Sequence, residues 1–341
     1  MDDYTDPATD NLTNQVISLQ TNFVLPFSNY DNQSIMAIAG FYALLFILGT
    51  CGNSAILAVV HHVRGTDCRA RHNTTLIYIC VLSVVDFISM LPLPTTIIDQ
   101  ILGFWMFGTF TCKLFRLLEH IGKIFSTFIL VCLSFDRYCA VCHPLQAQLR
   151  TNRLAHLMLT ILFGFTCIML APIAIFARSK EIIIFERYNN QTRELTVLHL
   201  YKCVDDLGKR LFVLFSLTCF VIAYLLPLIL MVFFYNGMLW RLFKQTRAVR
   251  KVYQGKHNPI SRIAIYTLAI CLFHFVCWTP YWISVLYSLY LEVFLPPDEA
   301  VLPSPAFIYF MYGVHALPYI NSASNFILYG LLNRQVRLIL S

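Results

Sequence analysis

The feature that most limits how this sequence can fold is a series of long stretches without a charged side chain. Five such stretches occur in the 341-residue chain, at 32–63, 154–177, 211–240, 263–291 and 300–333. Each is long enough for the ~20 apolar residues that cross a hydrocarbon layer ~30 Å thick. Two further apolar stretches carry charges, with one charged residue in 75–98 and six in 112–141. Backbone groups in lipid find no water, so all seven stretches are predicted to be membrane-spanning helices.

The composition excludes an ordinary soluble domain, because only 13% of the residues are charged and 58% are hydrophobic, where a soluble domain has about 25% charged residues. We expect a glycosylated extracellular segment at 1–34, a helix bundle at 35–332 and a short cytoplasmic tail at 333–341. The expected spans are about 35–61, 75–98, 112–141, 154–177, 211–240, 263–291 and 304–332.

The positive-inside rule orients the bundle. Residues 1–34 contain Asp but neither Lys nor Arg, whereas the loop from Arg241 to Arg262 contains many basic residues and no acid. The amino terminus is therefore predicted to be extracellular and the carboxyl terminus cytoplasmic. Three acceptor patterns for glycosylation, at Asn11, Asn32 and Asn190, lie outside in this topology.

The cysteines fit the same orientation. Among the twelve Cys, the predicted topology places only Cys112 and Cys203 in the oxidising compartment. We expect these two to form a disulfide, the alternative being two unpaired exposed thiols.

The long second extracellular loop contains two β-prone runs, 181–185 and 195–201, around an Asn-rich segment. This pattern predicts a β-hairpin. An irregular loop is the alternative.

Six of the seven predicted spans carry polar, aromatic or Pro residues that lipid does not explain. These are Gly52-Asn53, Asp86, Asp136-Arg137-Tyr138, Pro227 with Tyr235, Cys277-Trp278-Thr-Pro280 and Asn321 to Tyr329. In this order, and over residues 35–340, they resemble the motif set of rhodopsin-like (class A) G-protein-coupled receptors. The resemblance implies an all-α membrane protein, a seven-transmembrane helix bundle in the plasma membrane.

The resemblance also implies roles for several of these residues. A G-protein coupling and switch set would comprise Asp136, Arg137, Tyr138, Tyr235, Pro280, Asn325 and Tyr329. A pocket for an allosteric sodium ion would comprise Asp86, Ser126, Asn321, Ser322 and Asn325. A carboxylate within the membrane is usually functional or paired, and the alternative for Asp86 is a polar network filled with water. Arg137 could instead extend to lipid headgroups, and Trp278 could serve packing alone.

Two residues depart from the family pattern. Phe326 stands where Pro usually follows Asn325, and His274 stands where an aromatic residue usually precedes the Trp of the sixth span. These changes leave the predicted fold intact and concern the details of switching.

The last span has no Lys for a retinal Schiff base, and Tyr319 occupies the matching position. The chain resembles the somatostatin, opioid and allatostatin-C group of neuropeptide receptors at several positions, which are Pro94, Trp105 to Gly108, Glu119 and the segment from Cys277 to Trp282. That resemblance implies a peptide ligand and an inhibitory heterotrimeric G protein. The expected ligand-binding residues are Glu119, Lys123, Asp99, Trp278, Tyr281, Trp282 and Tyr319.

Glu119 and Lys123 are four residues apart and project from one side of a helix. Unpaired charges within a membrane are costly, so we expect an internal ion pair in the resting state. A ligand that brings both a cation and an acceptor would leave neither charge stranded. A purely structural pair is the alternative.

Other functions remain open at this point. A receptor of the same fold could bind a small amine or a lipid, or could be a scavenger that does not signal. A transporter or channel would show internal repeats with broken helices, and an enzyme would need facing acid pairs or His and Cys clusters. The sequence shows neither pattern, and we expect no enzyme, no nucleic-acid partner and no cofactor besides the sodium ion.

Overall fold

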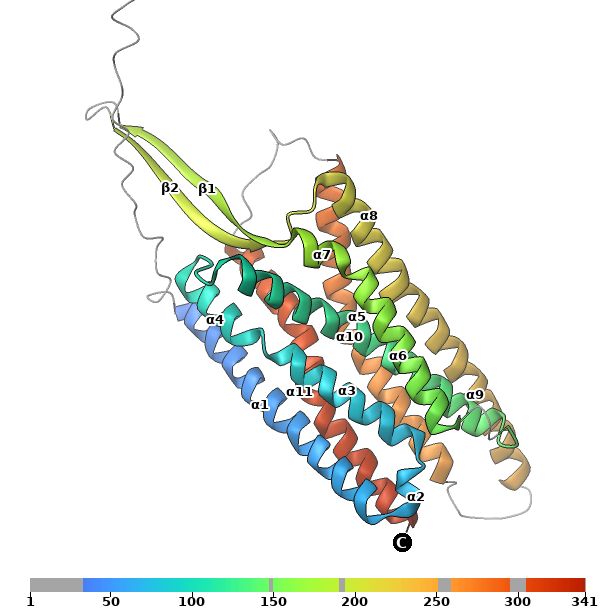
Figure 1. Ribbon diagram of the computed structural model, residues 1–341. Coiled ribbons are helices and arrows are strands. Elements are labelled where there is room, and N and C mark those ends of the chain that lie inside the picture. Colours follow the sequence, from blue (N-terminus) through green and yellow to red (C-terminus); the bar gives the residue numbers. More distant parts are fainter. Residues whose placement is uncertain (1–32, 147–149, 190–193, 251–258, 295–304, 341) are drawn as a thin grey trace, which may run out of the picture.

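The computed structural model describes residues 33–146, 150–189, 194–250, 259–294 and 305–340 as a helix bundle with one β-hairpin at one end (Figure 1). Its helices are α1 Gln33–Thr66, α2 Cys68–Arg71, α3 Thr74–Met90, α4 Leu93–Leu102, α5 Gly108–Cys142, α6 Asn152–Met169, α7 Ala171–Phe176, α8 Lys209–Phe220, α9 Leu226–Arg250, α10 Pro259–Phe294 and α11 Pro305–Leu340. The strands are β1 Arg178–Asn189 and β2 Glu194–Val204.

Six segments in the described part of the chain are long and apolar enough to cross a membrane. They are Gln33–Thr66, Thr74–Leu102, Gly108–Cys142, Asn152–Met169, Lys209–Lys244 and Tyr266–Phe294. The remaining long helix, α11, packs against α1 and α10. It buries three polar side chains, Asn321, Ser322 and Asn325, inside the bundle.

The bundle exposes large apolar side chains on its surface and buries several polar side chains beside its hydrophobic core. Large apolar side chains such as Ile161, Phe233 and Val276 are at least 60% exposed. Asp86 and Asn325, in contrast, are each 1% exposed and lie inside the bundle. Exposed apolar surface on this scale indicates contact with lipid, in agreement with the predicted membrane spans.

Prolines shape two of the spans. The second span consists of α3 and α4, and the break between them is at Pro92, whose carbonyl oxygen accepts hydrogen bonds from the hydroxyls of Thr95 at 2.7 Å and Thr96 at 3.1 Å. The fifth span contains a π-helical turn at Val221–Leu225 between α8 and α9. Pro227 has no N–H for the ordinary helical bond, so a wider turn just before it is physically reasonable.

Strands β1 and β2 pair antiparallel, from Arg178 opposite Val204 to Asn189 opposite Glu194, with a register shift between Ile183 and Phe185. The predicted hairpin is confirmed and is longer than its two β-prone runs. The hairpin projects from one end of the bundle, and the carboxyl-terminal end of α11 lies at the other end (Figure 1).

Two of the links between the hairpin and the bundle lie near the start of α5. The disulfide Cys112–Cys203 joins β2 to the first turns of α5, with the two Cα atoms 5.4 Å apart, and confirms the predicted pairing. Trp105, which precedes α5, donates its backbone N–H to the carbonyl of Tyr201 at 2.7 Å. The loop that follows β2 is therefore fixed above α5.

The disulfide should be needed for a stable outer end. We expect Cys203→Ala to lower the melting temperature and the surface expression, because loss of a native disulfide costs about 2–5 kcal/mol in small secreted domains. Thermal unfolding of the purified protein and surface labelling would measure both effects. Cys167→Ala is the matched control, since Cys167 is a free and exposed cysteine of α6. Equal melting temperatures for the two variants would contradict this role.

Candidate functional site

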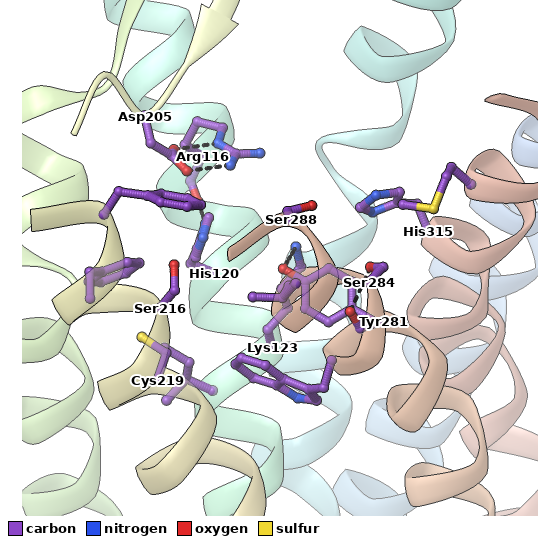
Figure 2. A pocket seen from close by; sticks show the side chains of 16 residues that line it. Arg116, His120, Lys123, Asp205, Ser216, Cys219, Tyr281, Ser284, Ser288 and His315 are labelled. Carbon is purple, nitrogen blue, oxygen red and sulfur yellow. Dashed lines mark hydrogen bonds and ion pairs between the residues drawn. The ribbon is translucent and has the colours of Figure 1, made fainter. Parts of the chain in front are cut away.

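A cavity of about 180 Å³ lies below the hairpin, between α5, α8, α10 and α11. We call it the outer cavity. Its lining combines charged and polar side chains with aromatic ones, among them Arg116, Lys123, Asp205, Tyr281, Trp282 and His315. Figure 2 shows Asp205 and Arg116 near the hairpin, Lys123 deeper in the bundle, and His315 on the opposite side from His120.

Charged groups form a continuous chain along this cavity. Asp205 accepts two hydrogen bonds from Arg116, from Nε at 2.6 Å and from Nη2 at 2.5 Å. Nη1 of Arg116 donates to Glu119 Oε2 at 2.8 Å, and Lys123 Nζ donates to Glu119 Oε1 at 2.6 Å. Lys123 also donates to the Tyr281 hydroxyl at 3.1 Å. The chain contains two carboxylates and two cations and is electrically neutral.

The predicted pair of Glu119 and Lys123 is therefore present, and Arg116 is a third member that the sequence analysis did not single out. Arg116 is three residues before Glu119 on α5, so its contact with Glu119 follows from helical spacing. Both oxygens of Glu119 are engaged by internal cations. A basic ligand group that reached this carboxylate would have to share its oxygens with Arg116 and Lys123.

Asp205 was also missed, and its position depends on the hairpin. The disulfide at Cys203 holds the loop two residues away. The next residue, Asp206, has a φ of 43° and pairs with Arg178 and with Lys180. Burial would raise the pKa of Asp205, but the hydrogen bonds and the charge of Arg116 outweigh it and hold this pKa below its usual value. Asp205 is therefore a carboxylate at neutral pH.

A second, smaller cavity of about 20 Å³ lies deeper and is lined by Glu119, Lys123, Trp278, Tyr281 and Tyr319, with Ser89 and Ser322 at its inner side. A volume of this size holds about one water molecule. The two cavities bring together six of the seven predicted ligand-binding residues. The seventh, Asp99, lines neither and faces Lys202 of β2, with N–O distances of 3.3 Å.

The Asp86 cluster lies further in. Asn325 donates to Asp86 Oδ2 at 2.7 Å, and Asn53 donates to the carbonyl of Ser322 at 3.1 Å. Of the other predicted ion ligands, Ser126 donates to the carbonyl of Gly122 on its own helix. Asn321 turns its Nδ2 to His274 at 3.3 Å.

The donor set fits a small hard cation. Four of the buried oxygens that have no hydrogen-bond partner among the described residues belong to predicted ion ligands or their neighbour Asn53, and they are Asn53 Oδ1, Asp86 Oδ1, Asn321 Oδ1 and Asn325 Oδ1. One carboxylate and several amide oxygens are ligands suited to such a cation. Buried acceptors without partners are costly, which an ion or water at this position would relieve.

His274 of α10 connects three helices through contacts to α5 and α11. Its Nδ1 faces Asn321 of α11, and its Nε2 lies 3.0 Å from the hydroxyl of Thr127 on α5. The amide of Asn321 can only donate here, so the proton of the neutral ring is on Nε2. Trp278 packs beside the same ring, with ring centres 5.7 Å apart. His274 therefore packs where an aromatic residue is usual in the family pattern, and it also forms a polar bridge between α5 and α11.

At the end of the bundle opposite the hairpin, Asp136 lies at the centre of a second charged cluster. It pairs with Arg137 and accepts hydrogen bonds from Thr74 at 2.5 Å and from Arg150 at 3.3 Å. Arg137 is only 9% exposed, so it is held inward here.

Two tyrosines of the predicted switch set lie near this cluster. Tyr138 packs on Phe234 of α9, and the Tyr235 hydroxyl lies 3.4 Å from both Ser134 and Cys271. Pro280 is inside α10. The side chain of Tyr329 and the three predicted glycosylation sites, Asn11, Asn32 and Asn190, fall outside the described residues.

Comparison with known proteins gives a family and relatives. Residues 34–329 match the model of the 7 transmembrane receptor (rhodopsin family). Neuropeptide receptor 18 of Caenorhabditis elegans is 64% identical over 324 residues, which are 92% of this chain and 68% of that protein. Galanin receptor 2b of Danio rerio is 27% identical, over 90% of this chain and 74% of its own length. Somatostatin receptor type 1 of Rattus norvegicus is 25% identical, over 88% and 69%.

The charged chain predicts unequal effects of neutral replacements. Glu119→Gln leaves Lys123 without its carboxylate, and breaking a buried pair from one side costs about 3–5 kcal/mol. Lys123→Gln leaves Glu119 paired with Arg116, so we expect a smaller loss. Thermal unfolding of the purified protein would measure both. Asp99→Asn is the control, because its partly exposed pair is worth only about 0–1 kcal/mol. A larger loss in Lys123→Gln than in Glu119→Gln would be inconsistent with this network.

Proposed function

Because this chain belongs to the rhodopsin family of seven-transmembrane receptors, we propose that it binds a peptide outside the cell and activates a heterotrimeric G protein inside it. The observation that carries this proposal is the outer cavity, where charged and aromatic side chains line one space below the hairpin. The relative that is 64% identical is a neuropeptide receptor, which supports the same class of ligand.

A peptide suits the outer cavity better than an amine or a lipid. Arg116, Lys123 and Asp205 line it, and Glu119 lines the smaller cavity and bonds both cations. Desolvation of these charges would disfavour a lipid chain. A simple amine offers one positive charge, whereas both oxygens of Glu119 are already bonded to Lys123 and Arg116. A peptide can bring donors, acceptors and apolar side chains together. In this proposal the ligand contacts residues of both cavities, namely Glu119, Lys123, Trp278, Tyr281, Trp282 and Tyr319. Asp99 contacts a part of the ligand near the hairpin.

The hairpin end is assigned to the outside of the plasma membrane. The disulfide Cys112–Cys203 is at this end, and disulfides persist in the oxidising extracellular compartment. The basic residues Arg64, Arg71 and Arg150 are at the other end, as the positive-inside rule requires of a cytoplasmic face.

The cytoplasmic cluster of Asp136 and Arg137 is assigned to G-protein coupling. In this structure the guanidinium is paired and buried, which suits a resting state. Release of Arg137 from Asp136 would make it available to a partner. The likeness to somatostatin receptor type 1, together with the motif resemblance, leads us to propose a G protein of the inhibitory type.

The proposal is tested by nucleotide exchange with purified receptor, candidate G proteins and a library of neuropeptides. At least one peptide should accelerate exchange, and an inhibitory G protein should respond more strongly than stimulatory ones. A library of amines and one of lipids, run in parallel, would identify the other ligand classes if either activates the receptor where peptides do not.

Arg137→Ala should reduce peptide-stimulated exchange to the level of a receptor-free sample, while surface expression and peptide binding remain. The reason is that the guanidinium is the charged group released when the cluster opens. Arg153→Ala is the matched control, an exposed arginine of the same cytoplasmic region. Wild-type exchange rates in Arg137→Ala would remove this residue from the proposed mechanism.

Sodium should lower the affinity for an activating peptide, because an ion shifts the conformational equilibrium only through its different affinity for the two states. A coupling of ordinary size changes affinity by about 5–150-fold. Asp86→Asn should abolish the dependence, since Asp86 supplies the charge of the proposed ion site. Competition binding in sodium chloride and in N-methylglucamine chloride separates sodium from ionic strength. An unchanged sodium response in Asp86→Asn would exclude this site.

A further inference from the structure

The two cations that line the outer cavity, Arg116 and Lys123, have more N–H donors than their bonds to internal partners use. A guanidinium has five N–H groups and an ammonium has three. Arg116 uses three of its five, two on Asp205 and one on Glu119. Lys123 uses two of its three, on Glu119 and on the Tyr281 hydroxyl. The remaining N–H groups of both residues have no acceptor among the described residues.

The carboxylates are less accessible from the same space. Both oxygens of Asp205 are held in a two-pronged bond to Arg116. Glu119 lines the smaller cavity and not the outer one. The charged side chains that line the outer cavity are therefore Arg116, Lys123 and Asp205, with a net charge of +1. A cationic group entering here would meet two like charges.

Aromatic side chains complete the walls. Phe212 and Phe215 of α8 and Trp282 of α10 line the cavity beside the cations. Such a wall suits a flat apolar group attached close to the charged one.

From this arrangement we propose that the outer cavity binds a carboxylate of the ligand between Arg116 and Lys123, with an adjacent aromatic or large apolar group against α8. The chemistry of the site follows from its own residues. Only the identity of the whole ligand as a peptide rests on the proposed function. The proposal reverses the polarity expected from Glu119 alone. The carboxylate can be a free peptide carboxyl terminus or an acidic side chain.

The test uses small probes and therefore needs no known agonist. Purified wild-type receptor is titrated with N-acetylphenylalanine, with N-acetylphenylalanine amide and with phenethylamine, and its melting temperature is recorded. A ligand that binds the folded state raises the melting temperature with its concentration. The acid should bind at least about tenfold more tightly than the amide, since a hydrogen bond to a charged group is worth that factor or more. Phenethylamine should bind more weakly still.

Two variants locate the site. Arg116→Lys keeps the positive charge but loses the forked geometry, and Lys123→Gln removes the deeper cation. Each should reduce the preference for the acid over the amide. Lys209→Gln is the matched control, an exposed cation at the start of α8, and should leave the preference unchanged. The comparison of acid with amide on the wild-type protein remains valid if a variant fails to fold.

The two sources of the carboxylate are separated by one more probe, N-acetylglutamate N-methylamide, whose only carboxylate is on the side chain. Preferential binding of either carboxylate supports the proposal and names the source. Four results would each overturn the proposal. The first two are equal binding of N-acetylphenylalanine and its amide, and stronger binding of phenethylamine than of N-acetylphenylalanine. The other two are a rise in melting temperature with sodium acetate as large as with N-acetylphenylalanine, and a preference for the acid that survives in both variants. These measurements contain no G protein, so they can fail while peptide-stimulated exchange succeeds, and the reverse outcome is equally distinct.

Discussion

Hydrocarbon offers no hydrogen-bond partner to a charged side chain, so each ionised group in the bundle needs its partners from within the protein. The outer half meets this constraint with the neutral chain from Asp205 to Lys123, which fixes the loop after β2 against α5. The half opposite the hairpin meets it with Asp136, which is surrounded by Arg137, Arg150 and Thr74. The positions of both ends of α5 depend on these clusters.

The middle of the bundle meets the same constraint only in part. Asp86 has the amide of Asn325 as a donor, and no cation pairs with it among the described residues. Several amide oxygens nearby also have no partner in that part of the chain. This lack of partners, in a layer that lies between two fully paired clusters, is the physical reason for proposing a sodium ion here. A state-dependent ion here would link ligand binding to the cytoplasmic cluster.

The two departures from the family pattern have structural explanations. His274 uses both ring nitrogens, toward Asn321 and Thr127, and so joins α11, α10 and α5 through hydrogen bonds where an aromatic ring would only pack. Phe326, in the place of the usual Pro, lies against α1 at Gly52. A Cβ at that glycine would overlap the Phe326 ring. Because His274 is on α10 and Asn321 is on α11, a movement of α10 away from α11 has to break the bond between these two side chains.

The sequence by itself determined the spans, the hairpin, the disulfide and the ion pair of Glu119 with Lys123, because these follow from local hydropathy, compartment and helical spacing. It also contained the signal for Arg116 on the same face of α5. Only the tertiary structure decided that Asp205 closes the charged chain, that Asp99 faces Lys202, and that His274 bridges three helices. These contacts join residues far apart in the chain, and no local pattern records which side chains meet when helices pack. The chemistry of the outer cavity depends on those distant contacts, because Asp205 and Arg116 together decide which charges remain available to a ligand.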